Sequence, residues 1–263
     1  MNRCKRICSP RPNRSAIPPV EVARIISYPE NARQRGKMEL EIIYEDDDVV
    51  VVNKPAGTIV HRAPGRKEES LADYLAAKRP AMRRVGSVER PGVVHRLDIE
   101  TSGVMVFAKN DFSYRALRGD FESHESIIKT YLAVLHGAPK PSHGRLETLV
   151  ARKADKKRMC VVEEGGVRAV SEWTVLKRQG PLSLVEFVIK TGRMHQIRLH
   201  SAHLGHPIVG DKLYGDKVKD ARLKAKPQRH LLHAVELGFL HPRTRKPLLF
   251  SAHPPYDMIY VNV

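Results

Sequence analysis

The sequence predicts an α+β domain with a mixed, largely antiparallel central sheet and flanking helices. Three observations carry this expectation: short β-branched runs bounded by turn residues are numerous, a few segments show helical apolar spacing, and Gly-rich turns join consecutive runs in the second half of the chain. Many strands with few helices between them are typical of this class. With 263 residues, the chain is long enough to bury a sizeable core.

The first expected elements are two strands over residues 42–44 and 49–52, joined by an acidic turn. Ser70 is expected to cap a helix that runs through Lys78. Short strands at 93–94 and 104–108 flank a polar loop.

Asp111 is expected to cap the next helix, which ends near Ser123, with Phe112, Leu117 and Phe121 as its apolar positions. The remaining pattern predicts strands over 130–135, 160–162, 170–176 and 184–189, a helix over 195–204 stopped by Gly205, and a last hairpin from 231–240 and 247–250.

Residues 1–37 are interpreted as a flexible basic leader and linker, and residues 38–263 as one domain. No apolar run approaches the roughly 20 residues that span a bilayer, so no membrane association is expected. Cys4, Cys8 and Cys160 do not form a disulfide framework, which favours a reducing, cytoplasmic location. Cys4 and Cys8 also lack a second ligand pair for structural zinc.

The charge is strongly positive: 46 lysines and arginines against 29 acids give a net charge of +17. Such a surplus favours a polyanionic partner, with nucleic acid the leading candidate, because neutralised phosphates release condensed counterions. Charge alone does not choose between DNA, RNA, a membrane surface and the ribosome.

The loop over residues 95–103 is the most informative segment for chemistry. Asp98 is a lone carboxylate beside Arg96, with Thr101 and Ser102 as nearby hydroxyl groups. A carboxylate on such a loop can serve as a nucleophile or a base. By itself, however, it can equally be an aspartate that satisfies its own turn.

The wider pattern resembles the RluA-type family of RNA pseudouridine synthases. Residues 95–103 match the signature H-R-L-D-x-x-T-S-G at all specified positions. The family's other segments lie in collinear order on either side of it, at 44–57 before it and at 129–133, 190–198, 205–211 and 231–234 after it. The resemblance runs from about residue 40 to the C-terminus. The segment before it looks too short and proline-rich to hold the S4-type RNA-binding module that the family often carries.

The resemblance implies an enzyme that rebuilds a uridine in place, across a catalytic cleft over the sheet and without a cofactor. Asp98 would be the essential carboxylate, attacking C1′ of the ribose or C6 of the base. Arg193 would pair with Asp98 and keep it ionised. Tyr131 would lie against the flipped uracil, near the C5 proton that must leave.

The RNA-binding residues implied by the same resemblance begin with Arg96, which would fill the gap left in the RNA stack or clamp a phosphate. Thr101 is also interpreted as loop architecture, and Gly103 is expected to adopt a backbone conformation that a side chain would forbid. The other expected RNA contacts are His95, Thr101, His195, Gln196 and Arg198.

Two other function classes remain open. A metal-dependent hydrolase could use Asp98 with the histidines at 195, 200, 203 and 206, although no metal is expected because the ligand set is incomplete. A non-catalytic RNA-binding or ribosome-assembly protein would keep the fold without the chemistry. The expected partner is ribosomal or transfer RNA, with a monomeric chain and no obligate protein partner.

Overall fold

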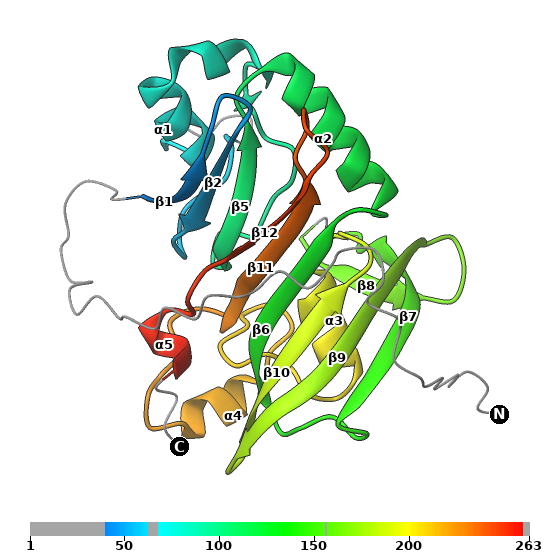
Figure 1. Ribbon diagram of the computed structural model, residues 1–263. Coiled ribbons are helices and arrows are strands. Elements are labelled where there is room, and N and C mark those ends of the chain that lie inside the picture. Colours follow the sequence, from blue (N-terminus) through cyan, green and yellow to red (C-terminus); the bar gives the residue numbers. More distant parts are fainter. Residues whose placement is uncertain (1–39, 63–67, 156, 260–263) are drawn as a thin grey trace.

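The computed structural model describes residues 40–62, 68–155 and 157–259 (Figure 1). The expected leader over 1–37, the boundary at residue 38, and Cys4 and Cys8 lie outside these residues. A ten-stranded sheet runs in the order β1-β2-β5-β11-β6-β10-β9-β7-β8, and β12 pairs with β11. Only β5 and β11 pair in parallel within this sheet as described, which confirms the predicted mixed, largely antiparallel α+β architecture.

The strands of the large sheet are β1 Glu41–Glu45, β2 Val49–Lys54, β5 Ser102–Ala108, β6 Ile128–His136, β7 His143–Arg152, β8 Met159–Val162, β9 Val167–Gln179, β10 Leu182–Ile189, β11 Leu232–Leu240 and β12 Pro247–Ser251. A small separate sheet pairs β3 Gly86–Ser87 with β4 Arg90–Pro91. The helices are α1 Leu71–Lys78, η1 Pro80–Arg84, α2 Asp111–Ser123, α3 Gln196–His203, α4 Lys217–Arg222 and α5 Tyr256–Ile259.

The helices cover the two faces of the sheet unequally. Apolar side chains of α1 and α3 share one core cluster with Phe107, Tyr131 and Phe187, whereas α2 packs Leu117 and Phe121 into a cluster on the opposite face. Figure 1 looks onto the α2 side, so α3 is seen behind β9 and β10. In the described ranges, no helix has both the length and the apolar character needed to cross a bilayer.

The predicted helix starts differ in one detail. Ser70 caps α1 in a capping box with Asp73, as expected for its type. The cap of α2 is Asn110, not Asp111, because the Asn110 side chain accepts the N–H of Ser113. Phe112 is 48% exposed, since it lies about 140° around the helix from the buried Leu117.

Two predictions of local structure were wrong. Residues 93–94 form no strand but a single bridge, Val93 to Phe107, because the preceding backbone turns back on Arg90. The second error is that β7 was not predicted at all. Its side chains are largely charged or part-exposed and therefore give little apolar alternation. The short helices η1, α4 and α5 were not predicted either.

Gly103 lies on β5, at the contact with the parallel strand β11. Its φ is +122°, and a Cβ there would lie 2.2 Å from the carbonyl oxygen of Ala234 on β11. The expectation of a conformation closed to side chains is confirmed. This close approach fixes the start of β5, and with it the loop that carries Asp98.

Candidate active site

The loop bearing Asp98 is anchored by buried groups on both sides. Its carbonyl at Ile99 accepts from the N–H of Gly57 at 2.8 Å and from Nζ of Lys54 at 2.9 Å. Thr101 is buried and its Oγ1 lies 2.7 Å from Nε2 of His230. These contacts hold a polar loop in one geometry, as a site on a rigid scaffold requires.

Asp98 pairs with Arg198 of α3. Nη1 of Arg198 donates to Oδ2 of Asp98 at 2.8 Å, while its Nε and Nη2 donate to the two oxygens of Asp211 at 2.7 and 2.8 Å. The side chain of Arg198 is 6% exposed and that of Asp98 is 21% exposed. Asp211 therefore fixes the guanidinium from behind, and Asp98 keeps one side open to solvent.

The electrostatics of this pair favour the charged arginine. Burial opposes the charge of Arg198, but the hydrogen bonds and charge of Asp211, followed by Asp98, outweigh it and hold the pKa of Arg198 above its usual value. Its guanidinium also lies 5.3 Å from the centre of the Tyr214 ring. A permanent cation thus stands beside the Asp98 carboxyl group.

The predicted partner of Asp98 was wrong, because no ion pair joins it to Arg193 in the described structure. Arg193 lies in the turn before α3, and its Nε donates to the carbonyl oxygen of Arg168. Arg198, expected only as an RNA contact, takes that place since the first turn of α3 directs it inward. Both arginines occur in one short motif, and their positions relative to the start of α3 decide which of them faces Asp98.

Two further groups lie on the Asp98 side of the sheet. Burial, and then the charge of Asp98, raise the pKa of Tyr131 on β6, so its phenol stays protonated and neutral. Lys54 is fully buried, and burial lowers its pKa to about 7 against the opposing charge of Asp98. Sequence reasoning missed Lys54, although a lysine ending a strand that begins with four valines was a visible signal.

His195 lies beside the carboxyl group, and Arg96 lies two residues before Asp98 in the chain. His195 has a left-handed backbone, with its Nδ1 3.0 Å from Oη of Tyr214 and its Nε2 3.8 Å from Oδ2 of Asp98. Burial lowers the pKa of His195, although the charge of Asp98 opposes the shift. Arg96 is exposed.

Three of the expected RNA contacts are instead held in internal bonds. His95 stacks on Phe121 at 4.5 Å, and its Nε2 accepts the N–H of Val106. Thr101 is occupied by His230, and the Gln196 side chain donates to the backbone of Val170. These residues shape the loop and the start of α3 because their polar atoms are already used within the protein.

The histidines after residue 195 do not converge. Both ring nitrogens of His200 face hydroxyl groups, those of Thr148 and Ser171, and Nδ1 of His206 lies 3.0 Å from the carbonyl oxygen of His136. His203 is exposed. Within the described residues, no group of three or more His, Cys, Asp or Glu side chains could hold a metal ion.

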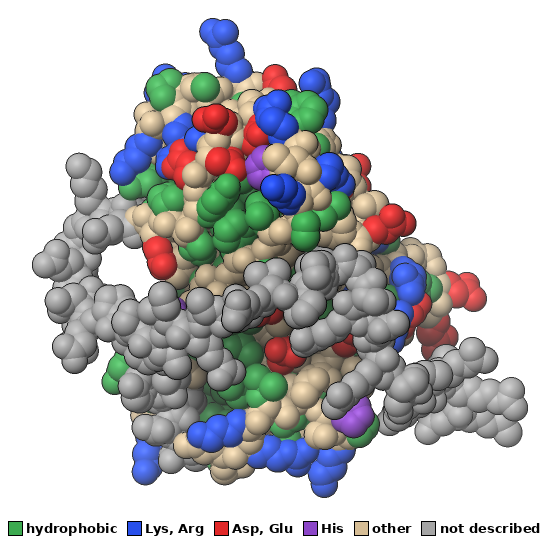
Figure 2. Space-filling view, viewed as in Figure 1, with side chains coloured by type: hydrophobic (Ala, Val, Ile, Leu, Met, Phe, Trp, Pro, Cys, Tyr) green, Lys and Arg blue, Asp and Glu red, His purple; other side chains and the backbone are tan. Residues whose placement is uncertain are grey.

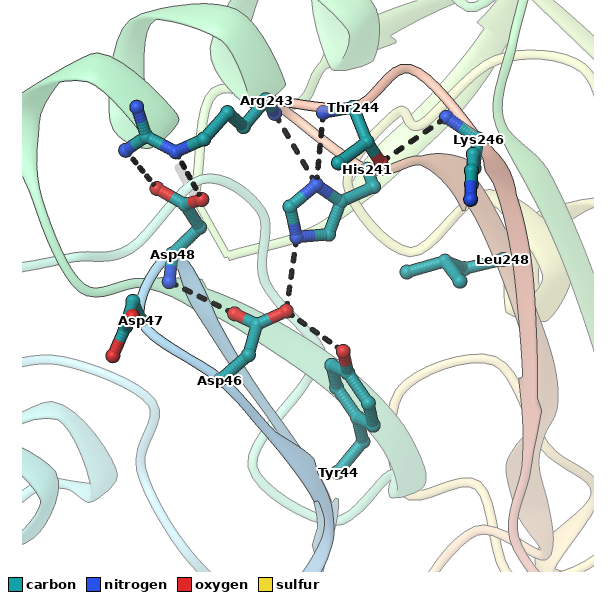
Figure 3. Close-up of a pocket in the computed structure, with 9 residues that line it drawn as sticks. All are labelled: Tyr44, Asp46, Asp47, Asp48, His241, Arg243, Thr244, Lys246 and Leu248. Carbon is teal, nitrogen blue, oxygen red and sulfur yellow. Dashed lines mark hydrogen bonds and ion pairs between the residues drawn. The ribbon is translucent and has the colours of Figure 1, made fainter.

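A separate polar pocket of about 380 Å³ lies between the β1–β2 and β11–β12 turns (Figure 3). Figure 2 shows acidic, basic and histidine side chains gathered on this upper part of the molecule. Oδ2 of Asp46 accepts from Tyr44 and His241, and Arg243 forms two hydrogen bonds with Asp48. The polar groups of this pocket form hydrogen bonds with one another and so hold the two hairpins together. The pocket lies apart from Asp98.

Stability is expected to fall as the pH drops from about 6.5 to about 4. Burial, the largest cause in each case, lowers the pKa to about 4 for His61, His200, His230 and His233, and to about 3 for His95. Unfolded histidines take up protons below about 6.5 while these do not, so protons favour the unfolded chain. Urea midpoints at pH 7 and pH 5 measure the effect, and equal midpoints would contradict it.

Carboxylates act in a lower window, which separates the two causes. Glu45 has its pKa lowered to about 2, chiefly by its hydrogen bond from Arg79. Its contribution is present above the ordinary carboxyl pKa and is lost only as the pH falls towards 2. His200→Gln should therefore flatten the decline between pH 6.5 and 4 without changing the decline below it.

Comparisons with known proteins show the family of the chain. Residues 48–203 match the family described as RNA pseudouridylate synthase. The ribosomal large subunit pseudouridine synthase D of Zymomonas mobilis is 40% identical over 228 residues, which cover 83% of this chain and 70% of that protein. The chain belongs to this family.

Other members of the family are similar to the chain over most of its length. An RNA pseudouridine synthase of Aquifex aeolicus is 40% identical over 82% of this chain and 70% of its own length, and one of Synechocystis is 38% identical over 77% and 62%. The structure of human RNA pseudouridylate synthase domain containing 1 superposes with a TM-score of 0.67 at 27% identity, covering 86% of this chain and 89% of that one. The chain thus spans between about three fifths and seven tenths of these bacterial relatives.

Proposed function

We propose that this chain converts a specific uridine of ribosomal RNA to pseudouridine, with Asp98 as the nucleophile and residues 38–263 as the catalytic domain. The observation that carries the proposal is the part-exposed Asp98 carboxyl group, 2.8 Å from the buried guanidinium of Arg198 and on the same side of the sheet as Tyr131. The three cysteines favour a reducing compartment, and the cytoplasm is the proposed location.

The proposed reaction balances without an external reactant. The Asp98 carboxylate attacks C1′ or C6 and forms a covalent bond, the bond between C1′ and N1 breaks, and the uracil turns. A bond then forms between C1′ and C5, and the bond to Asp98 breaks to restore the carboxylate. The proton on C5 leaves and N1 gains one, so substrate and product have the same composition. The neutral phenol of Tyr131 packs against the base, and Arg198 balances the carboxylate before attack and after its release.

Large-subunit ribosomal RNA is the favoured substrate because the relatives whose names give a target are called ribosomal large subunit pseudouridine synthases. Pseudouridine mapping of total RNA from cells with and without the gene tests this. We expect one or a few large-subunit positions to lose modification and to regain it with the wild-type gene but not with Asp98→Asn. Loss confined to transfer RNA would refute the ribosomal assignment while keeping the chemistry.

A further inference from the structure

Lys129 and His124 lie beside each other, and the turn that carries Arg193 passes over them. Lys129 lies on β6, His124 caps the C-terminus of α2, and Arg193 lies in the turn before α3. Nζ of Lys129 is 3.4 Å from Nδ1 of His124. A Cβ on Gly192 would be 3.6 Å from that Nζ and 3.9 Å from Cε1 of His124, so the glycine backbone lies directly over the pair.

This cluster has no counterion among the residues that the structure describes. Lys129 is 6% exposed, yet no described carboxylate lies within ion-pair distance of Lys129, His124 or Arg193. Burial, and then the charge of Arg193, lower the pKa of Lys129 to about 8. Burial, then Lys129 and Arg193, also lower the pKa of His124. A buried ammonium group without an acid is unfavourable unless an anion completes it.

The C-terminus of α2 explains only part of this arrangement. Its carbonyl groups favour a nearby cation only weakly compared with the cost of burying an ammonium group. Nζ of Lys129 donates to Nδ1 of His124, which places the imidazole proton on Nε2 as a further donor. Gly192 is exposed and adds no side chain, so a ligand can approach from solvent.

The position of the cluster identifies the ligand class. Lys129 lies two residues before Tyr131, about 7 Å away along β6. We propose that Lys129, His124 and Arg193 bind a phosphate of the substrate RNA, next to the nucleotide whose base enters the site. This rests on the proposed function, because the RNA strand must reach Tyr131 to place a phosphate here.

The test is RNA binding measured without turnover. Unmodified large-subunit ribosomal RNA transcript is titrated with Asp98→Asn protein at several KCl concentrations. Adding Lys129→Met should weaken binding about fivefold at 0.1 M salt and lower the salt-dependence slope by about 0.7, as expected for one lost single-strand phosphate contact. Arg193→Gln should act in the same direction, and the two changes together should cost less than their product, since both serve one phosphate.

A control and a folding check accompany the binding data. Lys177→Met removes an exposed lysine opposite Leu184, on the face of the sheet away from Tyr131, and should leave affinity and slope unchanged. Lys129→Met removes an unbalanced buried charge, so its melting temperature should equal or exceed that of the parent protein. Folded Lys129→Met and Arg193→Gln proteins with unchanged slopes would overturn the phosphate site. If Asp98→Asn kept its activity, the nucleophile assignment would fail while these binding results stood independently.

Discussion

Asp98→Asn should abolish uridine conversion and leave RNA affinity within about threefold. The amide keeps the size of the carboxyl group and its contact with Arg198, 2.8 Å away, but it cannot act as the nucleophile. Loss of a covalent nucleophile costs several orders of magnitude, and we expect a rate reduction of about 10⁴ or more. The measurement is release of tritium from RNA labelled at C5 of uridine, since the reaction expels that hydrogen.

A matched variant controls for the loss of one negative charge. Asp47→Asn makes the same substitution on an exposed turn outside the proposed site and should retain full activity. Tritium release by Asp98→Asn at even a tenth of the parental rate would remove the covalent role. Lost binding with lost release would instead favour an RNA-contact role for Asp98.

Arg198→Met should cost both activity and stability, the second large effect. The substitution strands Asp211, whose side chain has no exposed surface, and single removal of a buried ion-pair partner costs about 3–5 kcal/mol. It also removes the cation beside Asp98, so we expect kcat to fall at least about a hundredfold. Urea unfolding and single-turnover kinetics measure the two effects separately.

A second change separates the catalytic from the structural contribution of Arg198. Arg198→Met combined with Asp211→Asn removes the stranded charge and should recover most of the lost stability, but none of the activity. Arg193→Gln should raise KM and leave kcat near the parental value, because its guanidinium does not pair with Asp98. A kcat loss in Arg193→Gln as large as that in Arg198→Met would contradict the geometry.

The elements with strong local signals were predictable from the sequence. The valine run of β2, the cap at Ser70 and the glycine turns between β8, β9 and β10 gave correct element types, because periodicity and turn chemistry are local properties. β7 was missed since its charged side chains are satisfied across the strands, as in the ion pair of Arg168 with Glu147. Such pairing depends on register, which the sequence of one strand does not specify.

The sequence by itself determined the loop that carries Asp98, the strand that carries Tyr131 and the family to which the chain belongs, because each depends on contiguous residues. Only the tertiary structure decided that Arg198 faces Asp98 across 100 residues, and that Lys129 lies beside His124 with no carboxylate of the described residues paired to it. It also placed His95 against Phe121. The physical reason is that side-chain partners separated in sequence are set by helix phase and strand order, which follow from packing of the whole core.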